Sequence, residues 1–148
     1  MSDADRNRAA VIRAKAFFEA MAGPADVARM GEIYADDATF QDPFNDVAGL
    51  AAIERVYARM YEQIDDARFT IVETIADERG AMLVWDLRYR AKGGGSAATQ
   101  RIHGASHLKF ARDGRIAYHR DYWDAAGELY ARLPVVGALM RYLKRRIA

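Results

Sequence analysis

Halfway along the chain, the spacing of the apolar residues changes from a helical to a strand-like pattern. In the first half they recur every three or four positions, which predicts amphipathic helices at Arg8 to Ala22, Pro24 to Tyr34 and Gly49 to Ile64. In the second half, β-branched and aromatic residues predict strands at Arg68 to Ala76, Ala81 to Ala91, Gln100 to Ala111 and Arg115 to Trp123. Helices followed by strands indicate an α+β fold, with helices on one face of an antiparallel sheet.

Length and composition limit the possible classes of protein. A chain of 148 residues is sufficient for one domain, 1–148, with a core of about 8–124 and a helical extension of about 125–148. With 22 basic and 21 acidic residues, the net charge gives no reason to expect a nucleic-acid partner. The absence of cysteine excludes disulfides and thiolate chemistry. No signal sequence or integral membrane segment is apparent, so we expect a soluble, cytoplasmic protein.

The stretch YADDATFQDPF, residues 34–44, raises the question of why Asp42 stands directly before a proline. Asp36 and Asp37 are interpreted as solvated residues of a turn that ends a helix. Pro43 disfavours helix at Asp42 and favours an extended backbone there, which would fix the direction of its side chain. Asp42 is therefore either a catalytic carboxylate or a turn residue that accepts hydrogen bonds from nearby backbone N–H groups.

A second candidate site lies in the last predicted strand, RIAYHRDYWD. Because side chains alternate along a strand, His119, Asp121 and Trp123 share one face. A carboxylate beside an imidazole can fix its tautomer and favour the imidazolium, which would let His119 donate or accept a proton. The alternative is a buried His119–Asp121 hydrogen bond with no role beyond satisfying two polar groups.

The segments YADDATFQDP, GLAAIERVY and DGRIAYHRDYWD, together with the order of the elements, resemble the nuclear transport factor 2-like superfamily. Within it, the similarity is to the ketosteroid isomerase and SnoaL-like polyketide cyclase branch, over about Arg8 to Asp124. The resemblance implies a cone-like curved sheet around an apolar cavity, with the His119 face of its strand toward that cavity. It also implies a homodimer through the outer sheet face.

Carried over residue by residue, the resemblance puts Asp42 at the general base of a steroid isomerase and Tyr57 at a supporting tyrosine. The two oxyanion-donor positions fall at Phe18 and near Ser106, and neither residue type matches. Since losing an oxyanion donor costs roughly 3 to 4 kcal/mol of transition-state stabilisation, steroid isomerisation by that route is not expected.

These observations lead to a hypothesis of acid–base catalysis on a small hydrophobic molecule, of the isomerase, cyclase or hydrolase type, without metal or organic cofactor. The expected catalytic residues are Asp42, His119, Asp121 and Tyr57. The expected substrate-binding residues are Phe18, Leu83, Trp85, Ser106, Leu108 and Trp123. Two alternatives stay open: a module that only binds a hydrophobic ligand, and an interaction protein whose own side chains fill the cavity.

Two surface features remain. By alternation along the strands, the outer face of the predicted sheet carries Asp86, Arg88, His103 and His107. We interpret them as surface or interface residues. The C-terminal segment ARLPVVGALMRYLKRRIA is amphipathic and basic, with no acidic residue. Its apolar side, with Val135, Leu139, Met140 and Leu143, either packs on the domain or closes the cavity mouth, or it lies on an anionic membrane surface.

Overall fold

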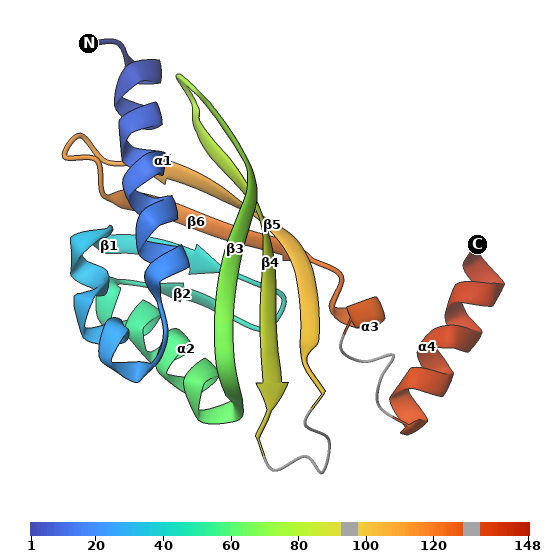
Figure 1. The fold of residues 1–148 in the computed structure, drawn as a ribbon. Helices are drawn as coiled ribbons and strands as arrows, with labels where there is room; N and C mark the ends of the chain where they lie inside the picture. The colour runs from blue at the N-terminus through green and yellow to red at the C-terminus, as the bar shows by residue number, and fades with distance from the viewer. Residues whose placement is uncertain (93–97, 129–133) are drawn as a thin grey trace.

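The structure, a computed structural model, describes residues 1–92, 98–128 and 134–148 (Figure 1). In chain order, the elements are α1 (Asp3–Ala20), the 3-10 helix η1 (Pro24–Glu32), β1 (Tyr34–Gln41), β2 (Asp46–Ala48), α2 (Leu50–Gln63), β3 (Ile64–Asp77), β4 (Gly80–Ala91), β5 (Gln100–Phe110), β6 (Ile116–Trp123), α3 (Ala125–Glu128) and α4 (Pro134–Ile147). The predicted Lys92–Thr99 loop and the predicted helix after Trp123 lie in part outside the described residues.

The sheet has six strands in the order β2-β1-β6-β5-β4-β3. Strands β3 to β6 form the predicted antiparallel meander, and β1 joins its edge by pairing in parallel with β6. Two register shifts in the β3–β4 pairing mark bulges, which bend a strand and increase its twist. The α+β prediction is confirmed: α1, η1 and α2 lie together on one side of a curved sheet (Figure 1).

Helix α1 begins with a capping box. The Ser2 hydroxyl accepts a hydrogen bond from the Asp5 backbone N–H, and the Asp5 carboxylate accepts one from the Ser2 N–H, each at 3.1 Å. This reciprocal arrangement satisfies two donors that the first helical turn leaves unpaired. The buried face of α1, which includes Val11 and Phe18, packs mainly against β3. The helix therefore closes one side of the core and brings Phe18 to the sheet.

The largest correction concerns the segment after Gly23. An α-helix to Tyr34 was predicted, but η1 ends at Glu32 and Tyr34 begins β1. Asp36 and Asp37 are exposed as expected, yet they lie in a strand and not in a helix-ending turn. The reason is tertiary: Tyr34 pairs with Ile116, and Phe40 pairs with His119, in the parallel ladder between β1 and β6. Local sequence contains no signal for a partner so distant in the chain.

The C-terminal helix differs from one of its two predicted arrangements. Val135 is 82% exposed and Leu139 is 51% exposed, so neither packs on the domain. Figure 1 shows α4 standing apart from the sheet. Arg132, which belongs to the same predicted segment, lies outside the described residues. None of the described helices is long and apolar enough to cross a membrane.

Candidate active site

A continuous line of hydrogen bonds runs through the core on the helix-covered side of the sheet. Its centre is His119, whose Nδ1 lies 2.7 Å from Tyr34 Oη and whose Nε2 lies 2.6 Å from Asp121 Oδ1. At one end, Tyr34 Oη is 3.1 Å from Tyr57 Oη. At the other, Ser106 Oγ donates to Asp121 Oδ1 at 2.5 Å and accepts from Trp85 Nε1 at 2.8 Å. We call these residues the buried chain: Tyr57, Tyr34, His119, Asp121, Ser106 and Trp85.

Strand pairing explains why these side chains meet. His119 and Asp121 are two residues apart on β6 and therefore point to the same face. Ser106 lies directly opposite Asp121 in the β5–β6 ladder. The tyrosines come from the helical layer and from the strand next to β6, since Tyr57 lies on α2 and Tyr34 begins β1.

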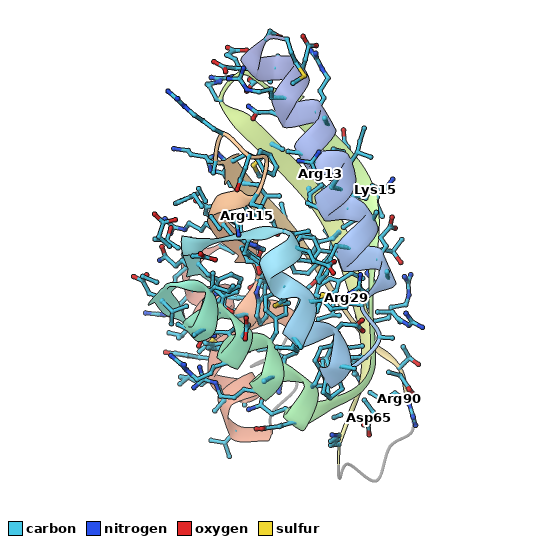
Figure 2. All side chains as sticks on the ribbon, turned by 90° about the vertical axis from the view of Figure 1, so that its left-hand side faces the viewer. Arg13, Lys15, Arg29, Asp65, Arg90 and Arg115 are labelled. Carbon is cyan, nitrogen blue, oxygen red and sulfur yellow. The ribbon has the colours of Figure 1, made fainter. Side chains whose placement is uncertain are left out.

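Two further residues hold this arrangement. Gly104 lies opposite Trp85 in the β4–β5 pairing, and a Cβ on it would come within 2.7 Å of the indole ring. The glycine therefore leaves the space that the Trp85 side chain occupies. Arg115, labelled in Figure 2, donates from one guanidinium nitrogen to the Tyr34 backbone oxygen at 3.4 Å and to the Gly31 oxygen at 3.5 Å. It ties the start of β6 to the start of β1.

The imidazole of His119 is enclosed by aromatic rings and is only 3% exposed. The Tyr34 ring stacks on it at a centroid distance of 5.9 Å, and the Phe40 and Phe18 rings lie at 4.7 and 6.0 Å. Both of its ring nitrogens have partners, so its orientation is fixed. Asp121 is less enclosed, with a side chain that is 16% exposed.

Burial raises the pKa of both phenols well above the ordinary value of 10.0. For Tyr57 the negative charge of Asp121 adds to this effect, and for Tyr34 the neighbouring Tyr57 does so before Asp121. Both tyrosines are therefore neutral hydroxyls at physiological pH. They can pass a proton along or donate a hydrogen bond, but they do not act as standing phenolates.

A cavity of about 730 Å³ opens between α2 and the sheet. Its size lies in the range typical of small-molecule sites. The wall is mostly apolar and is formed by Asp42, Phe44, Asn45, Val56, Tyr57, Arg59, Met60, Gln63, Ile64, Leu87, Tyr89, Ala91, Gln100, Ile102 and Trp123. Of the buried chain, only Tyr57 reaches this wall.

A much smaller cavity, of about 20 Å³, lies deeper in the core. It is lined by Phe18, Tyr57, Phe69, Ile71, Leu83, Trp85, Ser106 and His119. Tyr57 belongs to both linings and so separates the large cavity from the histidine. This position makes Tyr57 the link between the cavity and the rest of the buried chain.

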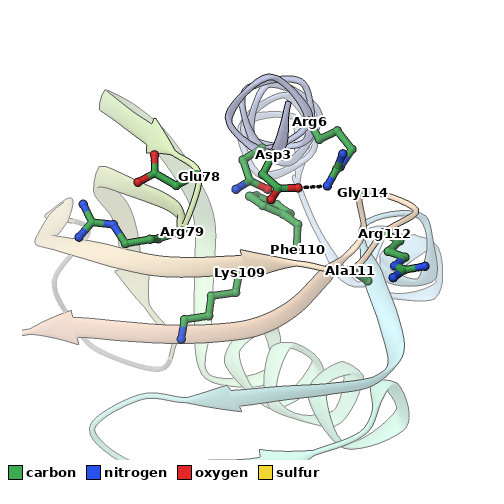
Figure 3. Close-up of a pocket in the computed structure, with 10 residues that line it drawn as sticks. Asp3, Arg6, Glu78, Arg79, Lys109, Phe110, Ala111, Arg112 and Gly114 are labelled. Atoms are coloured by element: carbon green, nitrogen blue, oxygen red, sulfur yellow. Dashed lines mark ion pairs between the residues drawn. The ribbon is translucent and has the colours of Figure 1, made fainter. Parts of the chain in front are cut away.

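A third hollow, of about 290 Å³, lies beside the first turn of α1 (Figure 3). Charged side chains surround it, including Arg6, Arg79, Lys109 and Arg112. Arg6 pairs with Asp3, and Arg79 pairs with Asp77 at 2.6 Å. Because the buried chain does not reach it, this hollow is the weaker candidate for a reaction site.

Asp42 lies in the wall of the large cavity, but its carboxylate is heavily engaged. Oδ1 accepts from the backbone N–H groups of Phe44 and Asn45, at 2.8 and 2.7 Å, and from Asn45 Nδ2 at 3.0 Å. Oδ2 accepts from the same amide nitrogen at 3.1 Å. These are the bonds of a turn aspartate, and they fix the connection between β1 and β2.

The expected site residues thus divide among different places. Asp42, Tyr57 and Trp123 line the large cavity; Phe18, Tyr57, Leu83, Trp85, Ser106 and His119 line the small one. Leu108 is fully buried and lines neither. The residue that sequence reasoning missed is Tyr34. It was visible at the start of YADDATF, but only the parallel pairing of β1 with β6 brings it to His119.

Within the described ranges, no group of three or more histidine, aspartate or glutamate side chains is arranged to hold a metal ion. On the outer face, Asp86 accepts a hydrogen bond from His103 Nδ1 at 2.7 Å and lies 3.4 Å from Arg101 Nε. These partners, His103 first, lower the pKa of the Asp86 carboxyl. The outer cluster is therefore stabilised by contacts within a single chain.

Several solved structures share this fold. They include a protein of ketosteroid isomerase-like fold from Catenulispora acidiphila, solved with trimethylamine, at 20% identity over 84% of this chain and 93% of that one, with a TM-score of 0.68. TsrD from Streptomyces laurentii is 18% identical over 88% and 97%, with a TM-score of 0.71. An LEH-like epoxide hydrolase from M. tuberculosis is 15% identical over 96% and 98%, with a TM-score of 0.65.

These likenesses define the fold class: a ketosteroid isomerase-like α+β fold whose helices cover one face of a curved sheet. Within that class, residues 14–119 match the model of the SnoaL-like domain, and the chain belongs to this family. No curated protein matches the sequence significantly.

Proposed function

We propose that this protein is a cofactor-independent acid–base enzyme that moves a proton on a small hydrophobic carbonyl compound bound in the 730 Å³ cavity. The observation that carries the proposal is the unbroken hydrogen-bonded path from Tyr57 in the cavity wall, through Tyr34, to His119 and Asp121. Proteins of this fold include one called an epoxide hydrolase, which supports a reaction on a small molecule.

The base is His119, acting through the two phenols. In the resting state, Nε2–H of the neutral imidazole donates to Asp121, Tyr34 donates to Nδ1, and Tyr57 donates to Tyr34. The Tyr57 oxygen then offers a lone pair to the cavity. Since His119 is buried behind Tyr57, this arrangement gives a deeply placed base a contact with substrate.

During the reaction, Tyr57 Oη takes a proton from the substrate carbon next to the carbonyl group. The original Tyr57 proton passes to Tyr34, and the Tyr34 proton passes to His119 Nδ1. The electron pair of the broken C–H bond stays on the substrate as an enolate. The imidazolium is stabilised by the Asp121 carboxylate 2.6 Å away. Reversal of the same transfers returns the proton to the same carbon or to another one.

Asp42 has a supporting part in this proposal. Its carboxylate lies in the same wall as Tyr57 and raises the pKa of that phenol, after burial and Asp121. Four hydrogen bonds to Phe44 and Asn45 occupy its oxygens. We therefore assign it the role of shaping the cavity mouth. The apolar substituents of the substrate contact Trp123, Leu87 and Ile102.

The test is deuterium exchange. The full chain is incubated in D₂O with hydrophobic ketones such as 2-tetralone, and loss of the α-proton signals is followed by NMR. We expect acceleration by the native protein and a loss of about 100-fold or more in His119→Gln and Tyr34→Phe, the usual share of general acid–base catalysis. Tyr61→Phe, on the same helix as Tyr57, is the control that should retain the rate.

Equal exchange rates in all three variants would contradict the assigned path. Ketones that bind the native protein without any exchange would instead favour the ligand-binding alternative, in which the buried chain only stabilises the core.

The proposal also includes a cytoplasmic location and a homodimer through the outer sheet face, around Asp86 and His103. The dimer is tested by sedimentation of the native chain and of an Asp86→Arg variant.

A further inference from the structure

The helix α4 carries an apolar stripe that nothing in the described part of the chain covers. Val135 and Ile147 are 82% and 83% exposed, and Leu139 and Tyr142 are each 51% exposed. Spacings of three and four residues place Val135, Leu139, Tyr142 and the 39% exposed Leu143 on one side of the helix. Large apolar side chains concentrated on one exposed helical stripe mark an interaction surface.

The remaining side of α4 is cationic. Arg141, Lys144 and Arg145 lie on the side of the helix that faces away from the apolar stripe. Arg146 lies at the C-terminal end of the helix. The helix contributes four of the 22 basic residues of the chain and none of its 21 acidic residues. The rest of the chain has 18 basic against 21 acidic residues, a net charge of −3. Positive charge is therefore concentrated beside the exposed apolar stripe.

We propose that α4 binds the surface of an anionic lipid membrane and so holds the protein there. At 1.5 Å per residue a 14-residue helix is about 21 Å long, too short to cross a hydrocarbon core of about 30 Å. An amphipathic basic helix of this kind lies in the plane of the membrane, with its apolar side among the acyl chains and its cations at the headgroups.

The charge distribution favours a membrane over a second copy of the chain. Arg146 follows Tyr142 by four residues and Leu143 by three, so it emerges within the apolar stripe. In a protein interface this guanidinium would have to be desolvated or paired. At a membrane its aliphatic stem lies along the apolar region while its charge reaches the phosphate level. Tyr142 suits the same boundary, since its ring is apolar and its hydroxyl polar.

The test is flotation of the purified full-length chain with vesicles of phosphatidylcholine alone or mixed with phosphatidylglycerol. We expect binding only to the anionic vesicles, weakened by added salt. The variant Arg141→Gln/Lys144→Gln/Arg145→Gln/Arg146→Gln should bind at least 100-fold more weakly, since one cation near the surface is worth about a fivefold change. Leu139→Ser/Tyr142→Ser/Leu143→Ser should also lose binding.

The matched control removes the same number of cations elsewhere: Arg6→Gln/Arg79→Gln/Lys109→Gln/Arg112→Gln, around the charged hollow of Figure 3. It should bind like the native protein, and circular dichroism should show that each variant is folded. Four results would overturn the proposal. The first two are that the native protein does not bind anionic vesicles, or that both α4 variants still bind them. The other two are that the control variant loses as much binding as the α4 variants, or that the native protein self-associates without lipid and the Leu139→Ser/Tyr142→Ser/Leu143→Ser variant does not.

Discussion

At the scale of single residues, two buried tyrosines one turn apart on α2 differ in whether their hydroxyl groups have a hydrogen-bond partner. Tyr57 Oη lies 3.1 Å from Tyr34 Oη, whereas Tyr61 Oη is buried without a hydrogen-bond partner among the residues that the structure describes. Burial raises the pKa of Tyr61 to about 12. An unpaired buried hydroxyl costs its desolvation energy without compensation. The two hydroxyls should therefore contribute to stability with opposite signs.

We predict that Tyr61→Phe raises the free energy of unfolding by about 1 kcal/mol, because it removes an unsatisfied polar atom and keeps the ring. Tyr57→Phe should lower it by about 1 kcal/mol, because it breaks the bond to Tyr34. Urea unfolding of both variants at neutral pH measures the difference. A stability loss in Tyr61→Phe as large as that in Tyr57→Phe would show that the Tyr61 hydroxyl has a partner.

At the scale of elements, the Trp85 side chain can pack against β5 only because residue 104 of that strand is a glycine. A Cβ on Gly104 would lie 2.7 Å from two indole carbons and 3.0 Å from the Trp123 Cβ. These contacts are tighter than side chains accept, and Trp85 is held in place by its bond to Ser106. The indole would have to move, and the buried chain would lose its terminal donor.

We predict that Gly104→Ala destabilises the fold by about 1 to 3 kcal/mol, the usual cost of overpacking a core. It should also change the tryptophan fluorescence of the native state. Gly23→Ala is the matched control, because a Cβ there meets nothing within 4 Å and the backbone is extended. Equal stability of the two variants would mean that the strands adjust without cost.

The elements also show what the sequence could predict. The segments of β4, β5 and β6 have strong strand patterns and short local connections, so their bounds were predicted to within a residue or so. His119 and Asp121 followed from alternation along one strand. Tyr34 did not, because its role depends on β1 pairing with β6, some 80 residues later in the chain. A partner chosen by the tertiary fold leaves no periodic signal in the local sequence.

At the scale of the whole molecule, the buried chain couples stability to alkaline pH. Folding raises the pKa of Tyr34 and Tyr57 above 10.0, mainly through burial. Above pH 10 the unfolded chain therefore releases protons that the folded chain keeps. The stabilisation is complete below pH 10 and decreases as the pH rises toward the folded-state values.

We predict that each of the two tyrosines contributes a fall of about 1.4 kcal/mol in the free energy of unfolding per pH unit above 10. Urea unfolding at a series of alkaline pH values measures the slope. Tyr34→Phe/Tyr57→Phe, which cannot ionise at these positions, should show a slope that is shallower by about 2.8 kcal/mol per unit. Tyr118→Phe, which leaves both buried phenols in place, is the control and should retain the fall that Tyr34 and Tyr57 contribute. Identical slopes in all three proteins would mean that the buried phenols ionise as readily in the folded state as in the unfolded state. In that case Tyr34 and Tyr57 could no longer be treated as neutral proton carriers.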